Sequence, residues 1–233
     1  MDPATLQTTF VDLSTPHLAD ACLRLGIPVR CAPARVRPLW SGVYVAGRVR
    51  PTQHCGSVDV FLEALERSDP GDVLVVDNQG REDEACVGDL VALEVARAGL
   101  EGIVIWGLHR DTAQLRSIGL PVLSEGAYPN GPERLTPQPA DALDVAQVGA
   151  HTVTSEDLVV ADDDGAIFVP LDRASEVAEA AARIRDTELA QAARMSDGTS
   201  LREQTRFADY LAARADGVTF RQHLRSLAAA IEE

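Results

Sequence analysis

An arginine and an aspartate stand side by side directly after an apolar stretch in the middle of the chain. Arg110 and Asp111 follow "GIVIW", residues 102–106, a run typical of a buried strand. An arginine can bind a carboxylate in a bidentate manner and stabilise a developing oxyanion, while an aspartate can ligate a hard divalent cation. The pair therefore indicates either a site for an anionic, metal-bound substrate or a surface salt bridge at a strand end.

A second group of candidates lies at the start of a predicted helix. The segment "GDLV", residues 88–91, begins this helix, and the first backbone N–H groups of a helix attract carboxylate or phosphate. Strands are predicted before and after the helix, at 72–77 and 102–106, which makes a βαβ unit. Because the carboxyl ends of parallel strands lie at one edge of a sheet, we expect Asp89 and Arg110 to be neighbours.

Other patterns that could carry chemistry point to structure instead. His109 adjoins the pair, but alternation along a strand turns its side chain away from the face that Arg110 uses. The segment "ADDDG", residues 161–165, is typical of a tight turn in a hairpin. The four cysteines show no C-x-x-C spacing, so neither a zinc ribbon nor a disulfide framework is indicated.

The remaining elements follow from hydrophobic periodicity and turn residues. The sequence predicts a helix from Ser14 or Thr15 to Gly26, a long helix from Asp172, as its cap, to about Arg194, and two more helices after it. We expect further strands at 43–51, 120–126, 158–161 and 166–169, a helix within "SVDVFLEALERSDPG", residues 57–71, before its Pro-Gly break, the helix of residues 88–98, and a short helix begun by "RDTAQL".

Composition limits the classes of partner. The formal net charge of −15 at pH 7 repels a nucleic-acid backbone and an anionic membrane surface, so direct binding to either is not expected. No segment matches a signal peptide, and no apolar run approaches the roughly 18 residues of a membrane helix. We therefore expect a soluble, cytoplasmic protein, in which an anionic small substrate would need a local cationic pocket.

Five segments, taken in order, resemble the RraA-like family, which includes metal-dependent class II 4-hydroxy-4-methyl-2-oxoglutarate / 4-carboxy-4-hydroxy-2-oxoadipate aldolases and the regulator of ribonuclease activity A. The resemblance covers about residues 12–195 and implies an α/β fold, a swivelling-domain-type β/β/α sandwich. We expect one domain over 1–195 and a C-terminal helical extension, an oligomer arm or a lid, over 196–233. The segments are "LADACLRLG", "DPGDVLVVDNQG", "GDLVALEVARAGLEGIVIWGLHRDTAQL", "GLPVLSEGAYPNGP" and "DLVVADDDGAIFVP".

The resemblance also implies roles for individual residues. The metal, Mg²⁺ or Mn²⁺, would be carried by Asp111, and an acid at Asp89 would hold metal-bound water. A glutamate on the late helix of a neighbouring subunit completes the family's site, and Glu188 is the best-aligned candidate. Active sites would then lie at the interfaces of a homotrimer or of paired trimers. The pyruvyl part of the substrate would be bound by Gly88, Asp89, Leu90, Val91 and Arg110.

Two positions depart from the family pattern. Gln114 stands where members often carry an acid, and Trp106 stands where they carry an acidic or small residue. A bulky indole at the strand end would fill part of the pocket and narrow or shift the range of substrates. These two residues are therefore where we expect the chain to differ from its relatives.

The resemblance implies a metal-dependent lyase that cleaves a 4-hydroxy-2-oxo acid to pyruvate by a retro-aldol reaction. The pyruvate enolate of this reaction also arises from oxaloacetate, so oxaloacetate decarboxylation is the expected side activity. One alternative is a non-catalytic regulator that binds a ribonuclease or another protein, which the acidic surface would suit. A second alternative is a lyase for a sugar-derived acid.

Overall fold

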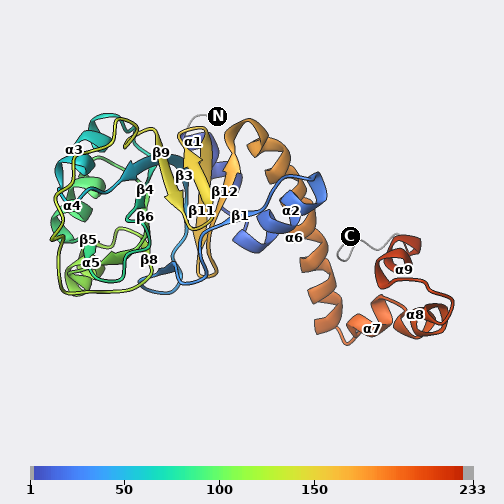
Figure 1. Cartoon of the computed structure of the whole chain (residues 1–233). Helices are drawn as coiled ribbons and strands as arrows, with labels where there is room; N and C mark the ends of the chain where they lie inside the picture. The colour runs from blue at the N-terminus through green and yellow to red at the C-terminus, as the bar shows by residue number, and fades with distance from the viewer. Residues whose placement is uncertain (1–2, 228–233) are drawn as a thin grey trace.

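The computed structural model describes residues 3–227 and is built on one curled, mixed sheet (Figure 1). Its strand order is β1-β12-β11-β3-β4-β6-β8-β2. Strands β3, β4, β6 and β8 run parallel to their neighbours in this group, whereas the strands on both sides of them pair antiparallel. The bounds are β1 (Arg30–Cys31), β2 (Arg37–Pro38), β3 (Val45–Gln53), β4 (Val73–Asp77), β6 (Gly102–Trp106), β8 (Val122–Ser124), β11 (Asp157–Asp162) and β12 (Gly165–Pro170).

The central strands β4 and β6 are buried on both faces, as their uninterrupted apolar sequences predict. Leu74 and Ile103 contribute to a cluster beneath three helices, while Val73 and Val104 contribute to a second cluster on the opposite face. This alternation is the two-residue period of a strand. The three helices are α3 (Asp59–Glu66), α4 (Asp89–Arg97) and α5 (Thr112–Ile118).

The sheet curls so that its two halves share the second cluster, and another group of helices covers the outer face of the β11–β12 hairpin. Val159 and Phe168 of the hairpin face that shared core, whereas Leu158 and Ile167 face the helices. A small hairpin of β9 (Val145–Val148) and β10 (His151–Thr154) also packs on the shared core. The outer helices are α1 (Pro3–Phe10), which the sequence did not predict, α2 (Thr15–Leu25) and α6 (Ala174–Ser196). The expected α/β fold with additional C-terminal helices is therefore confirmed.

The ends of the predicted helices agree with the sequence in one case and differ in another. Helix α2 is capped by Ser14, whose side chain accepts from the backbone N–H of His17, and it ends at Gly26 in the left-handed conformation. The expected cap at Asp172 is wrong, because that residue lies in a 3₁₀ turn, Leu171–Arg173, that leads into α6 without a side-chain cap.

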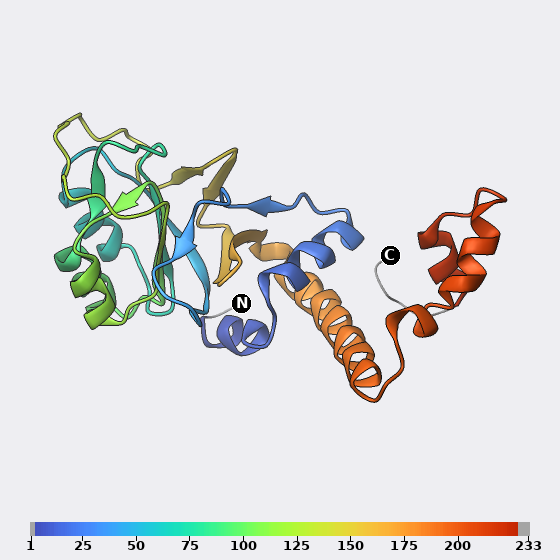
Figure 2. The same cartoon turned by 90° about the horizontal axis from the view of Figure 1, so that it is seen from below.

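The C-terminal segment forms three helices within the described residues, not the two expected. They are α7 (Leu201–Gln204), α8 (Phe207–Arg214) and α9 (Phe220–Ser226). Both views show them beyond the far end of α6 and away from the sheet (Figures 1 and 2). A small aromatic cluster that includes Tyr210 and Phe220 holds α8 against α9. We call residues 198–227 the arm; its first residue follows α6 closely, near the domain boundary expected at 195/196.

No helix in residues 3–227 is long and apolar enough to cross a membrane.

The hydrophobic clusters predict that the arm is dispensable for folding. All three clusters are built from residues up to Ile184, and none includes a residue of the arm. A chain that ends at Asp197 should therefore keep its helix and strand content by circular dichroism and lose less than about 1 kcal/mol of stability, which lowers the melting temperature by less than about 4 °C. A truncated chain that is unfolded or much less stable would show instead that the arm belongs to the folding unit.

Candidate functional site

The candidate site forms where the chain leaves the carboxyl ends of β4 and β6. The register of this pair runs from Val73↔Gly102 to Asp77↔Trp106, so both strands end at the same level. The segments that follow pair again as β5 (Ala85–Val87) and β7 (Leu108–His109), a short parallel ladder that the sequence did not predict. The backbone N–H of Arg110 then donates to the carbonyl of Val87 at 2.9 Å. The two predicted groups of residues are thus brought together.

Two glycines allow the charged side chains to approach the backbone. A Cβ atom at Gly88 would collide with Oδ2 of Asp111 and would lie 3.2 Å from Nε of Arg110. A Cβ atom at Gly131 would lie 2.6 Å from Nη1 of Arg110. Sequence reasoning missed Gly131, and the only available signal was the turn pattern "YPNGP" around it. The cluster of Gly88, Asp89, Arg110, Asp111 and Gly131 is called the Arg–Asp site below.

Asp111 is held in an unusual backbone conformation. It precedes α5 with φ 59°, in the left-handed region, and its carboxylate makes no cap bond to that helix. Instead, Oδ2 accepts the backbone N–H of Asp89 at 3.4 Å and lies 3.5 Å from Nε of Arg110. The carboxylate is therefore turned toward the start of α4, and this strained arrangement is typical of functional positions.

The Arg–Asp site is open to solvent. The side chain of Arg110 is 47% exposed and that of Asp111 is 35% exposed. At this exposure their ion pair stabilises the fold little, so a purely structural salt bridge does not account for the strained backbone. Both charges can be reached by a small ligand.

The carboxylates at this site suit a divalent cation that keeps most of its water ligands. Residues 3–227 contain no group of three or more histidine, cysteine or acidic side chains that could enclose a metal. Mg²⁺ binds through one or two carboxylates and keeps several waters, and Mn²⁺ shares its preference for oxygen ligands. The accessible carboxylate of Asp111 meets that requirement, and Asp89, whose backbone N–H lies 3.4 Å from Oδ2 of Asp111, adds a second acid at the start of α4.

Of the other predicted site residues, Asp89, Leu90 and Val91 lie at the start of α4, whereas Glu188 lies elsewhere. Asp89 is the first residue of α4, and its Oδ1 accepts the backbone N–H of Leu90 at 2.8 Å. The side chain of Leu90 is 74% exposed, whereas Val91 packs in the core. Glu188 is not in this group, because it lies on α6, across the molecule from α4 and α5, and contacts His17 at 3.2 Å.

The two positions that depart from the family pattern lie outside the Arg–Asp site. Trp106 packs against the shared core on the sheet face opposite α4, and a Cβ atom at Gly80 would lie 2.8 Å from its Nε1. Gln114 is exposed on α5. The effect of these two residues on the range of substrates stays a prediction.

His109 is buried on the side of β7 opposite Arg110, as the alternation predicts. Its Nδ1 is 2.7 Å from Oγ of Ser124, and its Nε2 is 2.9 Å from Oγ1 of Thr112. Burial lowers the pKa of His109, and the nearby charge of Arg116 lowers it further. Both ring nitrogens are engaged, so His109 positions the start of α5 and is not a general base.

The lowered pKa of His109 predicts a pH dependence of stability. Above the pKa of an exposed histidine, about 6.5, the folded and unfolded chains are both neutral at this residue. Below it the unfolded chain binds the proton more readily, so stability falls as the pH drops toward the folded pKa. Urea unfolding between about pH 7.5 and 5.5 should show a smaller loss for His109→Gln than for the native chain. Burial also lowers the pKa of His54, so only the difference between the chains reports on His109; equal losses would contradict this role.

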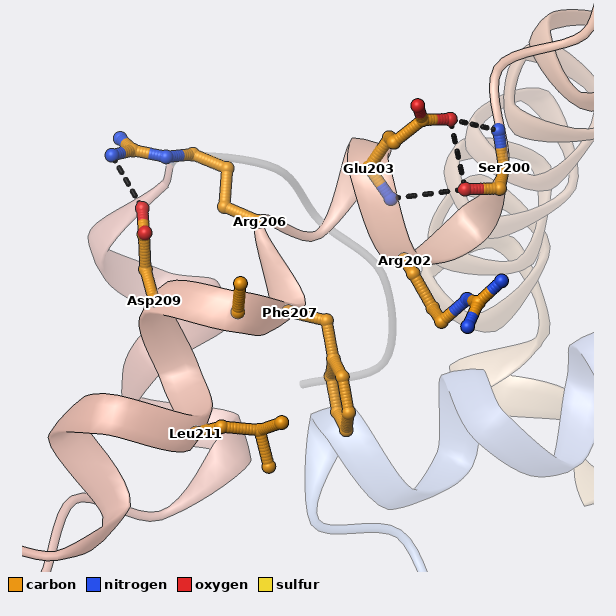
Figure 3. Close-up of a pocket in the computed structure, with 8 residues that line it drawn as sticks. Ser200, Arg202, Glu203, Arg206, Phe207, Asp209 and Leu211 are labelled. Carbon is orange, nitrogen blue, oxygen red and sulfur yellow. Dashed lines mark hydrogen bonds and ion pairs between the residues drawn. The ribbon is translucent and has the colours of Figure 1, made fainter.

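A hollow of about 590 Å³ on the arm does not form a comparable site (Figure 3). Four of the polar residues around it pair with one another: Glu203 and Ser200 form a reciprocal helix cap, and Arg206 pairs with Asp209 at 2.5 Å. Phe207 and Leu211 provide its apolar side. Arg202 is the remaining charged residue of the hollow, and one exposed arginine does not by itself make a binding site.

Comparisons with known proteins agree with the architecture. Protein DlpA of Legionella pneumophila is 33% identical over 135 residues, which cover 58% of this chain but only 22% of DlpA. The structure of Streptomyces coelicolor RraAS2, described as an unusual member of the RNase ES inhibitor RraA protein family, is 29% identical with a TM-score of 0.70, over 82% of this chain and 98% of that one. An uncharacterized protein from Pseudomonas syringae, 24% identical with a TM-score of 0.74, shares the fold over 86% of this chain and 96% of its own.

A family model supplies the assignment. The RraA-like model, described as Aldolase/RraA, matches residues 15–168, which are more than half of the chain and contain the whole Arg–Asp site. The matched region begins with α2 and ends in β12, so it takes in both halves of the curled sheet. On this match the chain belongs to the RraA-like family.

Proposed function

We propose that the Arg–Asp site is the active site of a metal-dependent lyase that cleaves a 4-hydroxy-2-oxo acid to pyruvate. The observation that carries this proposal is Asp111, whose left-handed backbone turns its carboxylate toward Arg110 and the first turn of α4. A docking surface has no need for that strain. Oxaloacetate decarboxylation, which passes through the same enolate, is the proposed side activity.

Each residue has a distinct task in this mechanism. The guanidinium of Arg110 and the first backbone N–H groups of α4 bind the carboxylate and oxo oxygens of the substrate. A divalent cation, Mg²⁺ or Mn²⁺, held by Asp111 would supply Lewis-acid activation of the 2-oxo acid. The half-exposed carboxylate of Asp89 accepts, through water, the proton of the 4-hydroxyl group.

The bond that breaks is the one between C3 and C4 of the substrate. Its electron pair moves to the 2-oxo group as the pyruvate enolate, and the hydroxyl carbon becomes the carbonyl of the second product. The positive charge of Arg110 stabilises the negative charge that grows on the enolate oxygen. A proton then returns to C3 and gives pyruvate.

A regulator of RNA processing is the second candidate. The observation in its favour is the similarity to RraAS2, which is described as a member of an RNase ES inhibitor family. The net charge of −15 suits a basic protein partner. This candidate predicts no catalysis at the Arg–Asp site, so the experiment below separates the two.

Removal of Asp111 tests the lyase proposal. With Mg²⁺ or Mn²⁺, the native chain should release pyruvate from oxaloacetate or from a branched 4-hydroxy-2-oxo acid, and a chelator should stop the release. Asp111→Ala and Arg110→Ala should each lower turnover by about a hundredfold or more, because each removes charge stabilisation of the enolate. Asp111→Ala should also weaken Mn²⁺ binding, measured by electron paramagnetic resonance.

The matched control is Arg97→Gln, which changes an exposed arginine in the last turn of α4 and should leave turnover unchanged. A native chain that releases no pyruvate in a metal-dependent way would favour the regulator. Full activity in Asp111→Ala would overturn the assignment of that residue.

Glu188 provides a test of sites shared between subunits. Within one chain it lies far from Asp111, so a role in the site requires a second chain, and we propose a homotrimer or hexamer for that reason. Asp111→Ala and Glu188→Gln should each be poorly active alone. Co-refolded at equal amounts, they should recover about a quarter of native turnover, because random assembly leaves that share of interfaces with both native residues.

A mixture of Asp111→Ala with Arg110→Ala serves as the control for this complementation. Arg110 and Asp111 belong to the same chain in every site, so mixing the two variants cannot bring both native residues together. Recovery is therefore excluded, because every site is built on a chain that lacks one of the two residues. If Glu188→Gln alone keeps native turnover, Glu188 is not part of the site.

A further inference from the structure

A second cavity lies on the other side of β7 from the Arg–Asp site. Its volume is about 280 Å³, and it is bounded by the β2 strand, the start of α5 and the end of β8. His109 lines it, whereas the next residue along the chain, Arg110, does not. The polar and charged residues around the cavity are Arg35, Arg37, His109, Thr112, Arg116, Ser124 and Glu125.

Two of the arginines carry positive charge that the described part of the chain does not neutralise. Arg37 donates to the backbone carbonyls of Ala34 at 2.8 Å and of Asp164 at 2.6 Å. Arg116 donates to the carbonyl of Leu39 at 3.3 Å. Carbonyl oxygens orient these guanidinium groups but do not balance their charge. In a protein of net charge −15, two arginines directed to one cavity without a paired carboxylate indicate a local site for anions.

Glu125 lacks the hydrogen-bond donors that a buried carboxylate needs. Its side chain is 2% exposed, and neither carboxylate oxygen has a hydrogen-bond partner. The nearest positive charge is Nη2 of Arg35 at 3.6 Å, and Nη1 of that arginine already pairs with Glu82 at 2.5 Å. Burial raises the pKa of Glu125, while Arg35 opposes the change. Because a buried polar group without a partner is costly, a donor from outside the chain would be stabilising here.

We propose that this cavity binds a small amino acid with an acidic side chain. Its two carboxylates would meet Arg37 and Arg116, and its ammonium group would donate to Glu125. The side chain of Arg35 is 64% exposed, so it can give up its 3.6 Å contact with Glu125 to the ammonium group while it keeps its pair with Glu82. A liquid water occupies roughly 30 Å³, so the cavity has room for a molecule of the size of aspartate. The proposal is independent of the lyase activity.

A matched pair of ligands tests the two halves of this proposal. L-Aspartate and succinate have the same two carboxylates, but only aspartate has an ammonium group. Calorimetric titration of the full chain should show saturable binding of L-aspartate and binding of succinate weaker by about tenfold, the effect of one charge-assisted hydrogen bond. L-Alanine, which lacks the second carboxylate, should also bind more weakly than L-aspartate.

Variants assign each interaction to a residue. Glu125→Gln should lower the affinity for L-aspartate to that for succinate, because it removes the charge that selects the ammonium group. Arg116→Gln should weaken both ligands by about tenfold or more. Arg97→Gln, which changes an arginine in the last turn of α4 as Arg116→Gln does in α5, should leave both affinities unchanged. Melting curves confirm that each variant is folded.

The outcomes separate this proposal from simpler alternatives. Equal affinities for L-aspartate and succinate in the native chain would overturn the role of Glu125 and leave a site for simple anions. Absence of saturable binding at millimolar concentration would overturn the whole proposal. In that case, a change of molar mass by light scattering in Arg116→Gln would identify the cavity as a contact between subunits. If Glu125→Gln does not fold, the affinities of the native chain and of Arg116→Gln for L-aspartate and succinate still test the proposal.

Discussion

The parallel pairing of β4 with β6 is the constraint on which the rest of the site depends. Both strands are buried on both faces, so their register cannot slip without moving apolar side chains out of the core. Because Asp77 and Trp106 end at the same level, the segments that follow leave the sheet together and pair again as β5 and β7. That second pairing places Gly88 against Arg110. The geometry of the charged cluster is thus a consequence of apolar packing one layer below it.

The strand β7 separates two polar environments with different properties. On one side, Arg110 and Asp111 are partly exposed and can exchange their mutual contact for contacts with a ligand. On the other side, His109 is buried, neutral by virtue of its lowered pKa, and bonded to two hydroxyl groups. The alternation of a strand therefore leaves one of two consecutive residues accessible to solvent and buries the other. His109 bonds to Thr112, the first residue of α5, and the partly exposed Asp111 directly precedes that helix.

The long helix α6 connects the sheet domain, against which its first half packs, with the arm at its other end. Its first half contributes to the core beside α2, and its second half extends to the arm (Figure 2). Along this extension Leu189 is 62% exposed and Met195 is 48% exposed. Apolar side chains on an extended helix favour burial against another chain. The same extension holds Glu188, which connects the proposed shared site with the proposed assembly.

The amino-acid sequence by itself determined the longer strands of the sheet and the charged residues of the Arg–Asp site, but not the short strands β1 and β2. Uninterrupted apolar runs predicted β4 and β6, helical periodicity predicted α4, and the turn "DDDG" predicted the β11–β12 hairpin, because these signals are local. The proximity of Asp89 and Arg110 also followed, since a right-handed βαβ unit leaves few alternatives.

Only the tertiary structure decided how the cluster is built and what surrounds it. Three features depend on contacts between segments that are distant along the chain: the left-handed backbone of Asp111, the approach of Gly131 to Arg110, and the buried carboxylate of Glu125 without a hydrogen-bond partner. The place of the arm is likewise a matter of tertiary structure, because its three short helices lie beyond the far end of α6 and away from the sheet. Such features leave no periodic pattern in the sequence. The sequence therefore indicates which residues are candidates, and the packing of the sheet decides how they are oriented and what they contact.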